Sequence, residues 1–215
     1  MKIKRFSSFY SVFYAIEWKG KRFLIDCGSP FDRKRIEQEV KRIDYIFITH
    51  GHWDHAGNAL FLKKEGAKIF IHEKDFFLIK NRIIHVPPPR KSLYSYFLFY
   101  TLNFLKKFAK VEYFEKDDLK NIEEVEIIET PGHTHGSCTY KIKDNYFIGD
   151  ILIGPNPFIK RPRLSFLIED KNVLKKTLEL LFEFEGKFYP GHGKVFSSYD
   201  LKKARDFIWR DLKVK

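Results

Sequence analysis

The residues best suited to chemistry lie in one short segment. Residues 49–55 contain three imidazoles and a carboxylate, contributed by His50, His52, Asp54 and His55. Imidazole nitrogens and carboxylate oxygens bind Zn, Fe or Mn, and the segment lacks the thiolates of a closed structural zinc site. It follows the apolar residues 45–48, where a strand is expected to end. The spacing therefore predicts a catalytic metal site in a loop, and the pattern suits two nearby metals.

Three further candidate ligands follow strand-like runs later in the chain. They are His133, Asp150 and His192. Each comes directly after a glycine, as expected where the backbone must turn sharply to present a side chain. Clusters of His and Asp with such spacing indicate metal or catalytic sites rather than solvated loops.

The order of these residues resembles that of the metallo-β-lactamase-fold hydrolase superfamily, and within it the glyoxalase II-like group. The motif His-x-His-x-Asp-His is followed by a His, an Asp and a His, and Asp26 at the end of residues 23–26 supplies an early motif. The resemblance extends from about residue 6 to residue 196. It implies an α+β fold in which two mixed β-sheets, flanked by helices, form a four-layer αββα sandwich.

The resemblance also implies a role for each candidate ligand. His50, His52 and His133 would bind one metal, Asp54, His55 and His192 a second, and Asp150 would bridge the two. Asp54 and Asp150 are the predicted catalytic residues. Two divalent ions are implied, zinc first, with iron or manganese as alternatives. A hydroxide between metals about 3.5 to 4 Å apart would be the nucleophile. Asp26 is interpreted as a support for the ligand loop or as a strand-end turn cap, and these readings are compatible.

The chain length predicts a single domain over residues 1–215. Sheet-rich chains of roughly 200 to 250 residues often form one domain, and no linker is recognisable. Hydrophobic periodicity predicts strands and helices that alternate in both halves. The expected strands are 9–18, 22–26, 45–48, 68–72, 125–129, 138–142, 146–148 and 187–189, and the expected helices are 32–42, 58–65, 171–184 and 199–212.

A segment at about 83–110 does not fit the compact version of the resembled fold. It is rich in Leu, Phe and Tyr and is expected to be a helical insert. So many large apolar residues would leave exposed hydrophobic surface unless something covers them. The segment is interpreted as a lid over the metal site, a homodimer contact or a lipid-facing surface, and the lid is favoured because insertions commonly shape the substrate pocket.

The formal net charge of +12 indicates either an anionic partner or a charged surface that faces solvent. Basic residues are spread along the chain, as is usual for a solvated surface. Lys160, Arg161 and Arg163 follow Asp150 closely, and they are candidates for contact with an anionic small-molecule substrate. A nucleic-acid partner is possible and not favoured.

Other sequence features concern the cellular location, the source and the remaining histidines and cysteines. No apolar run is long enough for a transmembrane segment, and the N-terminus lacks the core of a signal peptide, so a cytoplasmic location is expected. The single Gln among many Lys and Glu suggests a thermophilic source. Cys27 and Cys138 do not form a disulfide framework, and His72, His85 and His135 are not assigned as ligands.

The leading functional hypothesis is metal-dependent hydrolysis of an ester-like bond, with a thioester or lactone favoured. Only residues 193–215 follow His192, too few for the helical domain that helps classical glyoxalase II to bind glutathione, so a glutathione thioester is not expected. The alternative is phosphodiester cleavage similar to that of ribonuclease Z, because residues 50–57 match its motif and the chain is basic. Persulfide oxidation at one iron and a non-catalytic metal-binding module are further alternatives.

Overall fold

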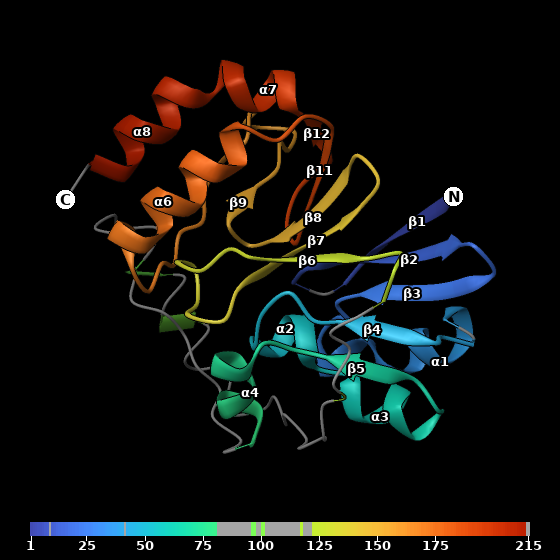
Figure 1. The fold of residues 1–215 in the computed structure, drawn as a ribbon. Helices are drawn as coiled ribbons and strands as arrows, with labels where there is room; N and C mark the ends of the chain where they lie inside the picture. Colours follow the sequence, from blue (N-terminus) through green and yellow to red (C-terminus); the bar gives the residue numbers. More distant parts are fainter. Residues whose placement is uncertain are drawn as a thin grey trace.

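A computed structural model describes residues 1–8, 10–40, 42–80, 96–97, 100–101, 117 and 122–213. The insert expected at 83–110 lies almost wholly outside the described residues, so its roles as lid, dimer contact or lipid surface remain predictions. Figure 1 shows two layers of strands packed face to face, with α6, α7 and α8 over one and α1 and α3 beside the other.

The first sheet is built from the N-terminal part of the chain in the order β1-β2-β3-β4-β5. Strands β1 to β3 pair antiparallel, whereas β3, β4 and β5 pair parallel. Its strands are β1 (Lys2–Ser7), β2 (Val12–Trp18), β3 (Lys21–Ile25), β4 (Tyr45–Phe47) and β5 (Lys68–Phe70). The helical segments that accompany them are η1 (Pro30–Asp32), α1 (Arg33–Glu39), α2 (Trp53–Ala56), α3 (Ala59–Lys64) and α4 (Glu73–Lys80).

The second sheet repeats this pattern in the order β12-β11-β8-β7-β6. Three antiparallel strands, β6 to β8, are followed by α6 and then by β11, which pairs parallel to β8. Its strands are β6 (Glu126–Glu129), β7 (Cys138–Ile142), β8 (Asn145–Gly149), β11 (Lys187–Pro190) and β12 (Phe196–Ser197). A small pair, β9 (Leu152–Ile153) and β10 (Arg163–Leu164), and the helices α6 (Lys171–Phe182), α7 (Ser198–Lys203) and α8 (Arg205–Lys213) complete this half.

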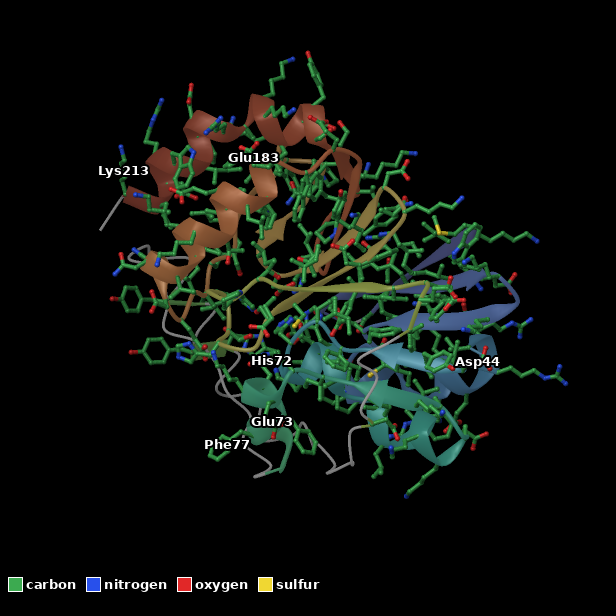
Figure 2. The ribbon with its side chains drawn as sticks, in the orientation of Figure 1. Asp44, His72, Glu73, Phe77, Glu183 and Lys213 are labelled. Carbon is green, nitrogen blue, oxygen red and sulfur yellow. The ribbon has the colours of Figure 1, made fainter. Side chains whose placement is uncertain are left out.

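Three apolar clusters hold these layers together. The cluster between the two sheets is rich in aromatic side chains, among them Tyr14, Phe47 and Tyr140, each at most 2% exposed. Burial of such large rings provides most of the favourable free energy of packing. The outer faces are covered by helices, as where Leu174 and Leu178 of α6 pack on the second sheet. Figure 2 shows side chains filling the space between the layers. The predicted α+β sandwich of two mixed sheets flanked by helices is confirmed.

The structure differs from the predicted elements in a few places. The edge strand β1, the helices α2 and α4 and the short strands β9, β10 and β12 were not predicted, and the helix expected at 199–212 is divided into α7 and α8 at Ala204. None of the described helices combines the length and apolar character that crossing a membrane requires.

The parallel strands determine where the candidate ligands lie. Asp26 follows β3 and His50 comes soon after β4, while Asp150 follows β8 and His192 follows β11. Parallel strands in one sheet present their carboxyl ends at the same edge, which is where such sheets place their sites. The two sheets therefore bring four strand-end loops to one place.

Candidate metal centre

The structure brings all seven predicted ligand side chains together in three overlapping groups. Within each group the ligand atoms lie within 4.8 Å of one another. The groups are His50, His52 and His133; His50, His55 and Asp150; and Asp54, His55 and His192. Because His50 belongs to the first two groups and His55 to the last two, the seven side chains form one continuous centre.

The three-histidine group joins the two halves of the chain. His50 and His52 lie in the loop after β4, and His133 lies in the loop between β6 and β7. The His133 Nε2 atom is 3.2 Å from the His52 Nδ1 atom. All three side chains are at least nine-tenths buried, so water competes little for their nitrogens.

Asp150 lies between this group and the carboxylate-containing group. Its Oδ2 atom is 3.0 Å from His192 Nε2 and 3.7 Å from His133 Nε2, and its Oδ1 atom is 3.5 Å from His55 Nε2. Asp54 Oδ2 is 3.5 Å from His55 Nε2 and 3.6 Å from His192 Nε2. The Asp150 carboxylate thus faces three imidazoles, which come from both ends of the centre.

Contacts behind the imidazoles fix their orientation. His55 Nδ1 lies 2.8 Å from Asp26 Oδ2, and His133 Nδ1 lies 2.8 Å from the carbonyl oxygen of Leu167. The Asp26 carboxylate also accepts the backbone N–H and the hydroxyl of Thr49, at 2.7 and 2.9 Å. An imidazole whose Nδ1–H is donated to such an acceptor presents its Nε2 lone pair to a metal. Asp26 therefore acts as the support predicted for it and belongs to none of the three groups.

The loop that carries His192 is held by hydrogen bonds from several elements. Tyr14 donates its hydroxyl to the carbonyl oxygen of Pro190 at 2.7 Å, and the Gly191 N–H donates to the carbonyl oxygen of Gly149 at 2.8 Å. Gly191 approaches the centre so closely that a Cβ there would collide with Asp150 and His55. A glycine at this position is required by the geometry.

The pKa shifts divide the metal-free centre into a neutral part and a charged part. Burial, and then the neighbouring imidazoles, lowers the pKa of His50 well below its usual value. Burial also lowers the pKa of His55, but Asp54, Asp150 and Asp26 outweigh it and raise that pKa to about 10. For Asp150, burial raises the pKa, but His192 and His55 outweigh this and hold it well below its ordinary range.

Several buried polar atoms at the centre have no hydrogen-bond partner. They include the Nε2 atoms of His50 and His55 and the Oδ1 atom of Asp150. Leaving such atoms unpaired in the interior costs free energy that a bound cation would recover. The donor set of imidazole nitrogens and carboxylate oxygens fits a divalent metal of the Zn, Fe or Mn kind.

His72, His135 and the two cysteines belong to none of the three groups, and His85 lies outside the described residues. His72 pairs with Glu129 at 3.5 Å, and His135, whose side chain is 64% exposed, pairs with Glu169 at 3.7 Å. Both cysteines are buried and unbridged. Burial raises the pKa of the Cys138 thiol to about 12, which makes it unreactive near neutral pH.

The basic residues after Asp150 contact the protein itself. Arg161 stacks over the Phe207 ring at 3.7 Å, and the buried Arg163 donates to the carbonyl oxygen of Gly154 at 3.4 Å. Lys160 is exposed. Of these three cations, only Lys160 takes no part in the contacts just described.

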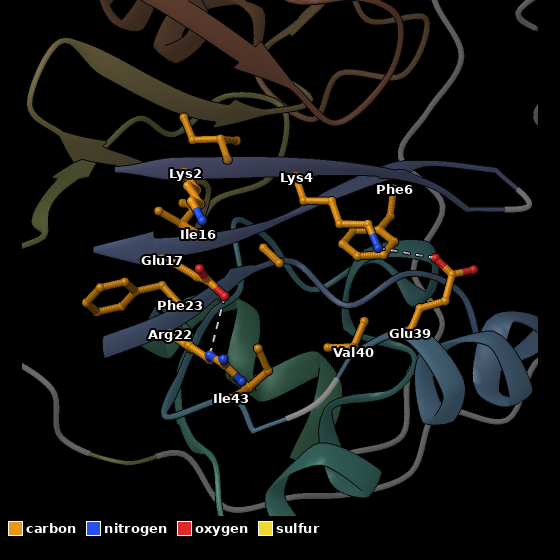
Figure 3. Close-up of a pocket in the computed structure, with 12 residues that line it drawn as sticks. Lys2, Lys4, Phe6, Ile16, Glu17, Arg22, Phe23, Glu39, Val40 and Ile43 are labelled. Carbon is orange, nitrogen blue, oxygen red and sulfur yellow. Dashed lines mark ion pairs between the residues drawn. The ribbon is translucent and has the colours of Figure 1, made fainter. Parts of the chain in front are cut away.

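A separate groove of about 570 Å³ lies on the edge of the first sheet, between β1 to β3 and the segment after α1 (Figure 3). Its carboxylates are paired with cations, Glu39 with Lys4 at 3.7 Å and Glu17 with Arg22 at 3.5 Å. None of its lining residues belongs to a metal-ligating group among the described residues. The groove is thus distinct from the candidate centre.

Sequence reasoning missed some residues that shape the centre. Thr49 and the Leu167 carbonyl group contact Asp26 and His133, and Asp75 of α4 accepts hydrogen bonds from two ligand loops. Thr49 adjoins the His motif, which is a usable signal. Asp75 has no recognisable spacing relative to the motifs, so only the three-dimensional structure identifies it.

Comparison with known families agrees with this arrangement. The profile of the metallo-beta-lactamase superfamily matches residues 9–200. The chain belongs to the metallo-beta-lactamase superfamily. The match includes every candidate ligand, from His50 to His192.

Two curated relatives in this superfamily cover most of the chain. A probable metallo-hydrolase of Methanocaldococcus jannaschii is 28% identical over 200 residues, which are 87% of this chain and 90% of the relative. The hydroxyacylglutathione hydrolase GloC of Haemophilus influenzae is 30% identical over 198 residues, 86% of each chain.

Two solved structures share the fold of this chain. TTHA1623, solved in a di-iron-bound form, superposes with a TM-score of 0.69 at 17% identity, covering 96% of this chain and 100% of that chain. ETHE1 from Myxococcus xanthus gives a TM-score of 0.62 at 19% identity, covering 100% of this chain and 92% of that chain.

Proposed function

We propose that this protein is a two-metal hydrolase that cleaves an ester-like bond, with a thioester or lactone as substrate. The observation that supports the two-metal assignment is the position of Asp150. Its two oxygens face His133 on one side and His55 and His192 on the other, at 3.0 to 3.7 Å. A carboxylate placed between two sets of imidazoles suits a bridging ligand.

In this proposal the first and the third of the three groups would each hold one ion. His50, His52 and His133 would hold the first ion, Asp54, His55 and His192 would hold the second, and Asp150 would contact both. Zinc is the favoured metal, and iron is the main alternative because TTHA1623 was solved in a di-iron-bound form. Elemental analysis of the purified protein tests both the identity and the number of ions.

Bound ions would supply Lewis acidity and a water nucleophile of lowered pKa. The residues of the chain hold this geometry and handle the protons. Asp26 orients the His55 ring, and the buried Asp150 compensates positive charge. Asp54, whose side chain is 13% exposed, is the carboxylate placed to accept a proton during attack.

The choice of an acyl substrate rests on the relatives and on the basic residues. The relative from Haemophilus influenzae is a hydroxyacylglutathione hydrolase, an enzyme named for a thioester substrate. Arg161 and Arg163, which a phosphodiester backbone would need, are instead engaged with Phe207 and the Gly154 carbonyl oxygen. We therefore favour a small acyl substrate over a nucleic acid.

The experiment compares turnover by the metal-loaded protein on a panel of thioesters and lactones and on a chromogenic phosphodiester. Hydrolysis of a thioester or lactone that is lost in His192→Ala supports the proposal. Cleavage of only the phosphodiester would replace it with the nuclease-like alternative. Absence of turnover on all substrates, with two metals bound, would favour a metal-binding module without catalysis.

His135→Ala is the matched control for metal content. It removes an imidazole two residues from His133 that lies outside every ligand group. We expect His192→Ala to lose metal and His135→Ala to retain it. Equal loss from both variants would contradict the ligand assignment.

A further inference from the structure

Asp75 is a buried carboxylate that takes no part in the three ligand groups. It lies in the first turn of α4, after His72 and Glu73, and is 1% exposed. Its Oδ2 atom accepts the Gly51 N–H and the Thr134 hydroxyl, each at 2.7 Å. Its Oδ1 atom accepts the Gly136 N–H at 2.7 Å. Both oxygens of the carboxylate thus accept hydrogen bonds from donors in two other segments.

Those donors require a carboxylate at this position. The N–H groups of Gly51 and Gly136 are backbone donors that cannot act as acceptors, and one faces each oxygen of Asp75. An amide side chain has only one oxygen, so it would direct an NH₂ group at one of the two N–H groups. Position 136 also has no room for a side chain, because a Cβ on Gly136 would lie 2.5 Å from Asp75 Oδ1.

The two segments that Asp75 joins carry the three-histidine group. Gly51 lies between His50 and His52, and Gly136 lies three residues after His133 in the same loop. The nitrogens of His52 and His133 are 3.2 Å apart across this junction. The opposite side of the centre depends on other contacts, namely Asp26 behind His55 and the Gly191 to Gly149 bond beside His192.

We propose that Asp75 is a positioning residue that sets the separation of the His50–His52 loop from the His133 loop, and thereby the affinity of the three-histidine group for its metal. Asp75 does not touch the ion. The proposal rests on the metal-binding part of the proposed function and is independent of the substrate. Residues that hold ligands in this way typically change metal affinity about 10 to 100-fold when replaced.

The test is a titration of metal-free protein with Zn²⁺ in competition with a chromophoric chelator. We expect two binding events in the wild type, and His52→Ala identifies which event belongs to the three-histidine group. In Asp75→Asn that event should weaken about 10 to 100-fold, while the other event changes little. The readout is binding alone and does not require turnover.

Asp117→Asn is the matched control. Asp117 also accepts a backbone N–H, from Ile69 at 2.8 Å, and pairs with Lys63, but it belongs to no ligand group and joins no ligand loops. The melting temperature of each metal-free variant separates a general loss of stability from a loss of affinity. We expect the shift that Zn²⁺ produces in the melting temperature to shrink in Asp75→Asn and to be retained in Asp117→Asn.

Wild-type affinity for both ions in Asp75→Asn would overturn the proposal, and so would equal weakening of both events. If Asp75→Asn does not fold, Thr134→Val carries the test. It removes one of the three hydrogen bonds and should weaken the same event to a smaller extent, and unchanged binding would overturn the proposal. Absence of two binding events in the wild type would instead contradict the two-metal function.

Discussion

Asp26 and Asp150 are buried carboxylates in equivalent positions, each at the end of a strand, yet they contact opposite sides of the same imidazole. Asp26 Oδ2 lies 2.8 Å from His55 Nδ1, and Asp150 Oδ1 lies 3.5 Å from His55 Nε2. The distance on the Nε2 side is longer, and the Nε2 atom of His55 points to a position between the Asp54 and Asp150 carboxylates. Asp26 thus orients the ring, whereas Asp150 is the aspartate that would share a metal with it in the proposed function.

Replacement of Asp26 tests this division. Asp26→Asn keeps the size of the side chain but leaves one oxygen to serve both the Thr49 N–H and His55 Nδ1. We expect the Asp54, His55 and His192 group to lose about 10 to 100-fold in metal affinity, because the His55 ring is no longer fixed. Metal content after dialysis against a chelator measures the effect, with circular dichroism as the check on folding. Full retention of both ions would show that Asp26 only caps its turn.

The raised pKa of His55 predicts that metal binding releases protons. In the metal-free protein this pKa is about 10, so the imidazole is protonated at pH 7 and must lose its proton before it can coordinate. Apparent metal affinity should therefore rise as the pH is increased from 7 towards 10. Calorimetry in buffers of different ionisation enthalpy measures the protons released. Binding heats that are independent of the buffer at pH 7 would exclude this linkage.

The candidate site was largely predictable from sequence at this scale, because its ligands are reactive side chains in short motifs with glycines beside them. All seven candidates converge in the structure. The contacts behind them were less predictable. Asp75 is one of 28 acidic residues in the chain, and only folding places it between the two loops. The Leu167 carbonyl oxygen that faces His133 is a backbone group, which carries no sequence signal at all.

At the scale of elements, α6 begins with a cap that also borders the His133 loop. The Asp170 side chain accepts the N–H groups of Asn172 and Val173, while its own N–H donates to the Gly132 carbonyl oxygen. We expect Asp170→Ala to lower the free energy of unfolding by about 0.5 to 2 kcal/mol. Urea denaturation measures the change. Asp170→Asn preserves the acceptor and should remain near the wild type, so similar losses in both variants would argue against capping.

Two of the elements that sequence reasoning missed, β1 and α4, are rich in charged residues. Strand β1 contains Lys2, Lys4 and Arg5 and buries mainly Phe6, because it is an edge strand with little apolar alternation. Helix α4 begins with three charged residues, and one of them, Asp75, points inward to meet hydrogen-bond donors. Strands with continuous apolar runs, such as β4 and β8, were predicted because both of their faces are covered.

At the scale of the whole molecule, the two halves repeat one arrangement of three antiparallel strands, a helix and a parallel strand. Strands β1 to β3, α1 and β4 correspond to β6 to β8, α6 and β11 (Figure 1). In both halves an aspartate follows the third strand and a histidine follows the parallel strand. Each proposed metal draws ligands from both halves, so the ions lie where the halves meet.

Metal removal should therefore destabilise the whole protein. The buried imidazoles and carboxylates bind an ion only in the folded state, so stability should rise with the logarithm of free metal concentration once the sites are nearly saturated. Thermal denaturation with and without a chelator, followed by Zn²⁺ addition, measures the shift and its reversal. A melting temperature that is indifferent to the chelator would mean that the centre binds metal weakly or not at all.

The same geometry makes each ion a removable cross-link. His52 and His133, which would share one ion, are 81 residues apart in the chain, so their joint coordination closes a long loop. Closing a loop of that length restricts the conformations of a partly opened chain in the way that a disulfide does. When the ions leave, separation of the two sheets costs less and the aromatic interior meets water more often. Amide exchange in β4, β7 and β8 would then report metal loss before any change in the average structure.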